Sequence, residues 1–248
     1  MLDPVFSHPL AHRGLHDAKV GIIENTRSAF EAAAVSGYGI ECDLQPAKGG
    51  EPMVFHDRAL DRLLGRPGEI SGFTPRQLAK FRYVGAPEPV LSFAQLLELV
   101  AGRVPLMVEI KSEWRPDEDR FYARIARLAK AYKGPIALKS FDPAVMQRIR
   151  RLAPYIPRGI ISGGYRGPGW WCDRLSLSDR FALRHLMAAA AVAPSFISYD
   201  IKALPAAAPM RLKRDFGVPL FAWTVRSPAD LAKAARLGAV PIFEGLRP

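Results

Sequence analysis

Short β-rich segments alternate with amphipathic stretches along the whole chain of 248 residues. This alternation predicts strands joined by crossover helices, and therefore a mainly parallel sheet. The predicted strands are residues 10–12, 39–44, 104–110, 136–140, 158–162, 195–199, 219–225 and 240–243. Eight such strands separated by helices predict a TIM-type (β/α)8 barrel. A doubly wound open sheet is the alternative, because the order of the strands cannot be read from one sequence.

Several of the stretches between the strands begin with residues that favour a helix N-terminus. Thr74, Asp142 and Ser227 can each act as an N-cap, and each is followed by a proline, which is favoured at the first helical position. Ser92 precedes another amphipathic stretch, and Asn25 or Thr26 precedes the first one. These signals support helices in the places that a barrel requires.

One segment departs from a plain barrel. Gly49 and Gly50 lie between two β-rich runs and predict a hairpin turn, so residues 52–56 are expected to form an extra strand beside the second barrel strand. The Gly- and Pro-rich residues from about 57 to 89 are then expected to form a small insertion over the barrel mouth. The whole chain, residues 1–248, is expected to form a single barrel domain with this insertion.

The charge of the chain favours anionic partners. The formal net charge is +11 and the isoelectric point is about 9.9, a balance suited to phosphates, nucleic acid or acidic membrane surfaces. The basic residues are scattered, and the patterns of RNA-recognition motifs and C2H2 zinc fingers are absent from the sequence, so we expect no nucleic-acid partner. A non-catalytic protein that binds anions or nucleic acid through this basic surface is the alternative class of function.

The cysteines and the N-terminal segment predict a cytoplasmic protein. Cys42 and Cys172 match neither a zinc motif nor a disulfide framework. The first residues do not form a basic segment followed by an apolar one, so no signal peptide is predicted. The most apolar stretch, residues 186–197, is too short and too interrupted by proline to span a bilayer. The sequence does not indicate an oligomeric state.

Polar side chains fall at the ends of the predicted strands, where TIM barrels carry their reacting groups. His12 ends the first strand, and Glu41 and Asp43 are two apart on the second, so that both point to one face. Glu109 and Lys111 repeat this pattern on the third strand. Carboxylates that face the inside of a barrel are costly unless they are paired or bind a metal. Three of them at the mouth predict a site for a hard cation, Mg²⁺ or Ca²⁺.

Two tryptophan positions have different interpretations. Trp223 lies at the end of a predicted strand and is expected at the barrel mouth, where it can pack on an alcohol moiety. Trp170 and Trp171 are adjacent in a loop. We expect them to pack within the loop, with a lipid- or substrate-facing patch as the alternative.

Five short runs of the sequence carry the polar residues at the predicted strand ends and in the first loop: AHRG at 11–14, ENT at 24–26, IECDL at 40–44, VFHD at 54–57 and MVEIKS at 107–112. FAWTV at residues 221–225 is a further run, near the C-terminus. Together these motifs resemble the glycerophosphodiester phosphodiesterase family, in which FAWTV is similar to a late-strand tryptophan motif. The resemblance covers nearly the whole chain and is strongest over residues 11–112, and the compact segment of residues 56–78 is similar to the short insertion of the smaller, cytoplasmic bacterial members.

The resemblance implies roles for the residues that match these motifs. His12 and His56 match the acid/base pair, while Arg13 and Lys111 match residues that contact phosphate. Glu24 and Asn25 match a motif that supports the site from the first loop. The metal-binding carboxylates of the family match Glu41, Asp43 and Glu109. Many members end with a Thr-Asp-x-Pro element, and here Glu244 takes the place of the aspartate.

The activity implied is metal-dependent hydrolysis of glycerophosphodiesters to glycerol 3-phosphate and an alcohol, with Mg²⁺ or Ca²⁺ as the cofactor. Histidine titrates in a range that allows it to deprotonate a nucleophile and protonate a leaving alkoxide. Direct attack by water and attack by a neighbouring substrate hydroxyl both remain open. A lysophospholipid cleaved in the manner of a phospholipase D, on the same fold, is the nearest alternative substrate.

Overall fold

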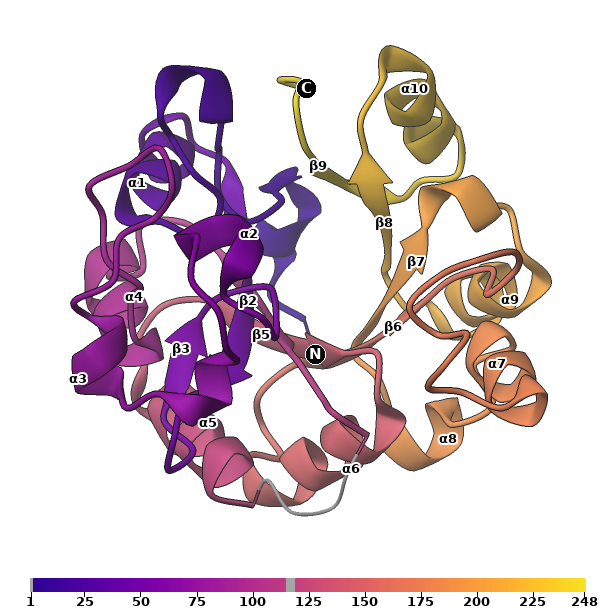
Figure 1. Cartoon of the computed structure of the whole chain (residues 1–248). Helices are drawn as coiled ribbons and strands as arrows, with labels where there is room; N and C mark the ends of the chain where they lie inside the picture. The colour runs from indigo at the N-terminus through magenta and orange to yellow at the C-terminus, as the bar shows by residue number, and fades with distance from the viewer. Residues whose placement is uncertain (1, 115–118) are drawn as a thin grey trace.

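Eight parallel strands form a closed barrel in the computed structural model, which describes residues 2–114 and 119–248 (Figure 1). The first strand, β1, pairs in parallel with both β2 and β9, so the two ends of the sheet meet. The barrel prediction is therefore confirmed, and the open-sheet alternative is wrong. The barrel strands are β1 (Leu10–Ala11), β2 (Gly39–Pro46), β4 (Leu106–Ile110), β5 (Ile136–Ser140), β6 (Arg158–Ser162), β7 (Phe196–Asp200), β8 (Leu220–Val225) and β9 (Val240–Phe243).

The helices between the strands surround the barrel (Figure 1). Their N-termini follow the sequence signals: the side chain of Thr26 caps the first helix, and Ser92, Asp142 and Ser227 cap later ones. The surrounding helices are α1 (Arg27–Val35), α4 (Phe93–Val100), α5 (Asp119–Ala131), α6 (Pro143–Leu152), α7 (Leu177–Arg184), α8 (Ala189–Val192), α9 (Ala207–Phe216) and α10 (Pro228–Arg236). Shorter 3-10 turns are η1 (Pro4–Ser7), η2 (Ala18–Val20) and η4 (Ile201–Ala203).

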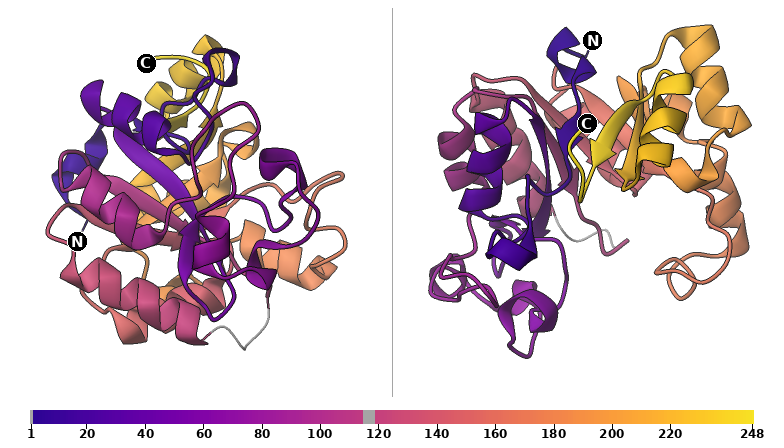
Figure 2. Two further views of the ribbon diagram at one scale, coloured as in Figure 1. Left: turned by 60° about the vertical axis from the view of Figure 1, so that its left-hand side comes forward. Right: turned by 90° about the horizontal axis from the view of Figure 1, so that it is seen from above.

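The predicted hairpin is present beside the barrel. Strand β3 (Pro52–Val54) pairs antiparallel with the end of β2, in a register that sets Val54 against Leu44. The chain after it forms α2 (Asp61–Leu64), η3 (Ile70–Gly72) and α3 (Pro75–Leu78), whose apolar residues form a small hydrophobic cluster with the hairpin. In Figure 2 this segment extends from the side of the barrel opposite the N-terminus.

The inside of the barrel has an apolar floor and a charged upper layer. Phe6 of η1 packs under the barrel against Leu10, Phe196 and Phe221, and this cluster fills the floor. Along β4 the inward position changes from Met107 to Glu109 in one step of two residues. The neighbouring positions on the strands face the helices and join the main core, where Cys42 is fully buried. Charged side chains therefore gather at the carboxyl ends of the strands.

Within the described ranges, no helix combines the length and the hydropathy needed to cross a lipid bilayer.

Candidate active site

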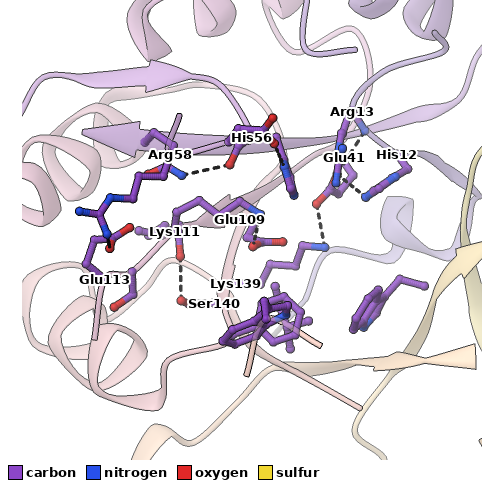
Figure 3. A pocket seen from close by; sticks show the side chains of 18 of the residues that line it. His12, Arg13, Glu41, His56, Arg58, Glu109, Lys111, Glu113, Lys139 and Ser140 are labelled. Atoms are coloured by element: carbon purple, nitrogen blue, oxygen red, sulfur yellow. Dashed lines mark hydrogen bonds and ion pairs between the residues drawn. The ribbon is translucent and has the colours of Figure 1, made fainter. Parts of the chain in front are cut away.

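A cavity of about 600 Å³ lies at the carboxyl ends of the barrel strands (Figure 3). All of the predicted site residues except Asp43 line it, which brings together side chains from β1, β2, β4, β8 and the hairpin. Asp43 is buried directly beneath, where it contacts Lys111 and Asn25. The structure therefore places the eight predicted residues in one site.

The three predicted metal ligands converge. Asp43 on β2 lies opposite Glu109 on β4 in the parallel register, and Glu41 is two residues earlier on the same face as Asp43. One carboxylate oxygen from each of the three residues lies within 4.8 Å of the others. All three side chains are buried. An all-oxygen donor set of this size is suited to Mg²⁺ or Ca²⁺ rather than to metals that prefer nitrogen or sulfur.

Three cationic side chains compensate these carboxylates. Nζ of Lys111 lies 2.8 Å from Oδ1 of Asp43 and 2.6 Å from Oε1 of Glu109. Nζ of Lys139 lies 2.9 Å from Oε1 of Glu41, and Nε of Arg13 lies 3.4 Å from Oδ2 of Asp43. These cations keep a buried cluster of negative charge stable in the folded protein.

The same contacts keep Glu41 and Asp43 ionised. Burial alone would raise the pKa of Glu41, but Lys139 and His12 together outweigh burial and hold this pKa below its usual value. In the same way Lys111 holds the pKa of Asp43 well below its usual range. Burial lowers the pKa of Lys111, whereas Asp43 and Glu109 raise it further, so the amine stays protonated. Metal ligands must be deprotonated, so these carboxylates fit a divalent cation.

A tight turn after β1 aims Arg13 at the carboxylates. Arg13 has a φ of 57° and Gly14 has a φ of 81°, and a Cβ at Gly14 would lie 2.8 Å from the backbone of Ala29. The backbone N–H of Arg13 donates to Oε2 of Glu41 at 3.2 Å, and its guanidinium donates to Glu24 at 2.8 Å. These contacts explain why His-Arg-Gly follows the first strand.

Asn25 supports the cluster from the first loop. Its Nδ2 donates to Oδ2 of Asp43 at 2.9 Å, and its Oδ1 accepts the backbone N–H of Asp43 at 3.4 Å. Asn25 is fully buried and has a φ of 57°, a left-handed conformation that asparagine tolerates better than most residues. It therefore fixes the position of one of the three carboxylates.

His12 lies between two carboxylates. Nδ1 lies 2.7 Å from Oε2 of Glu244, and Nε2 lies 4.0 Å from Oε2 of Glu41. The guanidinium of Arg226 also donates to Glu244 at 2.9 Å. With Nδ1 engaged by Glu244, Nε2 is the nitrogen directed toward the carboxylate cluster.

His56 approaches from the hairpin, and Figure 3 shows the rings of His12 and His56 on either side of Glu41. Nδ1 of His56 lies 2.6 Å from Oδ1 of Asp57. Both oxygens of Asp57 accept hydrogen bonds from Arg62, which in turn donates to Glu24. The two histidines thus have the same arrangement, with a carboxylate at Nδ1.

Lys139 is a site residue that sequence reasoning missed. Its side chain is only 2% exposed, and it stands opposite Glu109 in the register of β4 and β5. The signal in the sequence is a lysine inside an otherwise apolar buried strand, at a position that shares its inward face with Ala137. The contact between His12 and Glu244 was also missed, although Glu244 was noted as a departure from the motif.

One wall of the cavity is aromatic. Phe141 and Trp223 meet edge to face with ring centroids 5.3 Å apart, and Trp170 lies 5.4 Å from Phe141. Trp114 extends the wall next to Trp170. Trp223 therefore lies at the mouth as predicted, and an apolar surface faces the charged residues across the cavity.

The sequence model of the Glycerophosphoryl diester phosphodiesterase family matches residues 12–244. A glycerophosphodiester phosphodiesterase of Caldanaerobacter subterraneus subsp. tengcongensis is 27% identical in an alignment of 240 positions that covers 92% of this chain and 90% of that protein.

Solved structures show the same fold. A glycerophosphodiester phosphodiesterase from Thermotoga maritima superposes with a TM-score of 0.70 at 21% identity, over 94% of this chain and 92% of that one. A phosphodiesterase from Oleispira antarctica, in complex with the product sn-glycerol 3-phosphate, has a TM-score of 0.74 at 19% identity, over 95% and 92%. With the family match extending from His12 to Glu244, the chain belongs to the glycerophosphoryl diester phosphodiesterase family.

Proposed function

We propose that this chain hydrolyses glycerophosphodiesters to glycerol 3-phosphate and an alcohol, with a divalent cation bound by Glu41, Asp43 and Glu109. The observation that carries the proposal is the convergence of these carboxylates, within 4.8 Å of one another, at the base of the cavity that two histidines also line. A binding protein without catalysis has no need of both arrangements in one place. The family match and the product bound to the Oleispira antarctica relative support the same activity.

When bound, the cation would offset negative charge on the phosphoryl oxygens and thereby supply Lewis-acid stabilisation. Arg13 and Lys111 add positive charge at the same place, since both line the cavity and both contact Asp43. Lysine has three donors, and two of those on Lys111 are directed at Asp43 and Glu109. We assign the remaining donor to a phosphoryl oxygen of the substrate.

We assign the proton transfers to His12 and His56. Each has a carboxylate at Nδ1, which leaves Nε2 as the atom that takes or gives a proton. One histidine deprotonates the nucleophile, and the other protonates the oxygen of the leaving alcohol. The nucleophile is either water or a neighbouring hydroxyl of the substrate, and the latter gives a cyclic phosphate first.

We place the alcohol moiety between the aromatic wall and the segment of residues 57–89. Asp57, Arg58 and Ala59 line the cavity next to His56, and Trp223 lines it from the opposite direction.

The free thiols Cys42 and Cys172 support a reducing compartment, and we keep the cytoplasm as the expected location.

A lysophospholipid is a second candidate substrate, and one observation favours it. Trp114, Phe141, Trp170 and Trp223 give the cavity an apolar side that a glycerophosphodiester with a small polar alcohol does not need. Aromatic side chains bury a large apolar area, which suits an acyl chain near the mouth. Cleavage on the headgroup side would then release a lysophosphatidic acid.

The experiment is a product assay with glycerophosphocholine, glycerophosphoethanolamine and lysophosphatidylcholine as separate substrates. We expect glycerol 3-phosphate from the first two, and its absence with both would contradict the proposal. Lysophosphatidic acid from the third would support the second candidate. The variant Trp223→Ala should lower turnover of lysophosphatidylcholine more than that of glycerophosphocholine, because glycerophosphocholine has no acyl chain that could contact the aromatic wall. Phe216→Ala, a change to an exposed aromatic ring on α9, is the control.

A further inference from the structure

Exposed apolar side chains gather in one stretch of the chain. Of the nine large hydrophobic side chains that are exposed in the described residues, four lie between positions 170 and 187. They are Trp170, Leu177, Phe181 and Met187, with exposed fractions of 42%, 79%, 59% and 65%. Large apolar side chains that group together on a protein surface are a feature of protein and membrane interaction sites.

Helix α7 carries two large apolar side chains on its exposed face. Leu177 and Phe181 are four residues apart and therefore share one face of the helix. On the inward face of the helix, Leu183 is buried and packs with Leu175 and Tyr165. The side chain of Arg180 donates to the backbone carbonyls of Leu175 and Cys172, which ties the preceding loop to the helix. The exposed face is therefore held in place without contributing to the core.

Arginines accompany these apolar side chains. Arg166 and Arg184 line a second cavity of about 630 Å³ beside the loop, together with Lys202. Within residues 2–114 and 119–248, the side chains of Arg166 and Arg184 form no ion pair with a carboxylate. Lys202, in contrast, is paired with Asp230. Asp200 also lines this cavity, but two arginines outside the ion pairs of the described residues, next to an apolar face, form a combination that attracts anionic lipid headgroups.

This surface lies on the same side of the molecule as the active-site cavity. In Figure 2 the connection between β6 and α7 extends from the barrel on the same side as the segment after β3, opposite the N-terminus. Trp170 and Arg174 belong to this connection and also line the active-site cavity. A flat partner that contacts the exposed face of α7 would therefore lie next to the mouth of the barrel.

We propose that residues 166–187 form a docking surface for anionic phospholipid membranes. Leu177 and Phe181 insert among the lipids at the level of the headgroups, with Trp170 and Met187 beside them, while Arg166 and Arg184 contact the phosphates. A second copy of the chain fits this surface poorly, because a two-fold contact would gather Arg166 and Arg184 of both copies in one interface. The proposal extends the second candidate function, because lysophospholipids reside in membranes and docking would bring the active site close to them. Binding to the membrane itself does not depend on catalysis.

The test is co-sedimentation of the whole protein with vesicles of phosphatidylcholine alone and of phosphatidylcholine mixed with phosphatidylglycerol. We expect binding to the mixed vesicles, little binding to the neutral ones, and weaker binding as salt increases. The double variant Leu177→Ser/Phe181→Ser should bind the mixed vesicles about tenfold less, because two apolar groups are lost from the interface. Arg166→Gln and Arg184→Gln should each weaken binding about fivefold.

Two control variants lie elsewhere on the surface. Phe216→Ser removes an exposed aromatic ring at the end of α9, and Arg236→Gln removes an exposed cation at the end of α10. Both should bind the mixed vesicles like the wild type. The proposal is overturned if the wild-type protein does not co-sediment with the mixed vesicles, or if Leu177→Ser/Phe181→Ser binds them as strongly as the wild type. It is also overturned if that variant instead breaks a dimer seen by size exclusion. Turnover of soluble glycerophosphocholine, assayed without vesicles, separates failure here from failure of the proposed activity.

Discussion

Nδ1 of His12 lies 2.7 Å from Oε2 of Glu244, although 232 positions separate the two residues. The contact follows from closure of the barrel: β1 and β9 pair in parallel with Ala11 opposite Phe243, so the next residue of each strand lies side by side. Burial raises the pKa of Glu244, but the hydrogen bonds with His12 and Arg226 outweigh it and hold this pKa well below its usual range. Glu244 therefore stays ionised and fixes the ring of His12 with Nε2 toward Glu41.

We predict that Glu244→Gln lowers kcat about a hundredfold, within the range for a lost acid/base group. The amide can donate to Nδ1 and so favour the wrong tautomer of His12. Glu244→Asp is the matched variant, since it keeps the charge and should retain much of the activity. Steady-state kinetics on both variants is the measurement. An unchanged kcat in Glu244→Gln would show that the carboxylate does not position His12.

Replacing either histidine should remove catalysis and spare metal binding. His12→Ala and His56→Ala are each expected to lose about 10²- to 10⁴-fold in kcat, because each removes a proton-transfer group. Calorimetric titration with Mg²⁺ or Ca²⁺ should still show binding, since these ions prefer oxygen ligands. His8→Ala, on the exposed N-terminal segment, is the control. Near-normal kcat in a folded His12→Ala or His56→Ala protein would refute the role of that residue.

The buried ion pair of Lys139 and Glu41 predicts an altered response to metal. Lys139→Met leaves Glu41 without its partner in the metal-free protein, and an uncompensated buried charge costs about 3–5 kcal/mol. The variant should therefore melt at a lower temperature, and Mg²⁺ or Ca²⁺ should raise its Tm more than that of the wild type. Lys202→Met, which breaks a pair with an exposed lysine, is the control and should change the metal response little. Equal metal-induced shifts in Lys139→Met and wild type would contradict this account.

The pair of His56 and Asp57 predicts a dependence of stability on acid. Burial raises the pKa of Asp57, but hydrogen bonds from His56 and Arg62 outweigh it, so the pKa lies well below the ordinary aspartate value. Because the unfolded chain binds the proton more readily, the contribution of Asp57 is complete above an ordinary pKa of about 3.9 and declines as pH falls below it.

The measurement is urea unfolding of wild type and Asp57→Asn at neutral pH and across the acid range. The wild type should be the more stable at neutral pH, and the difference should shrink as the pH falls through the folded pKa of Asp57. A difference that stays constant with pH would mean that the charge of Asp57 does not stabilise the fold.

The fold was predictable because each strand carries its own signal. Residues 39–44 and 136–140 are β-rich runs in the sequence, and Asp142 and Ser227 mark helix starts without any tertiary information. The inward face of β2 was equally readable, since Glu41 and Asp43 are two residues apart. Closure of the barrel could not be read, because it depends on the pairing of β1 with both β2 and β9.

The parts of the site that the sequence missed are long-range contacts. Lys139 is a single lysine whose partner, Glu41, lies on a strand that is not adjacent to its own. Arg62, in the segment after the hairpin, donates hydrogen bonds to both Asp57 and Glu24. Its position beside these two residues depends on the tertiary packing of that segment. A residue that positions another side chain through a long-range contact leaves no local pattern in the sequence. A pair of carboxylates two residues apart on a strand leaves a pattern that can be recognised.

The most direct test of the central claim is to measure turnover of glycerophosphocholine against bound metal, counted by elemental analysis of the same samples. We predict that protein stripped of metal is inactive, that Mg²⁺ or Ca²⁺ restores activity in proportion to occupancy, and that Glu109→Gln needs a higher metal concentration. Glu51→Gln, a change to a carboxylate paired with Arg124 away from the cluster, should respond like the wild type. Full turnover in protein shown to contain no divalent metal would contradict the account.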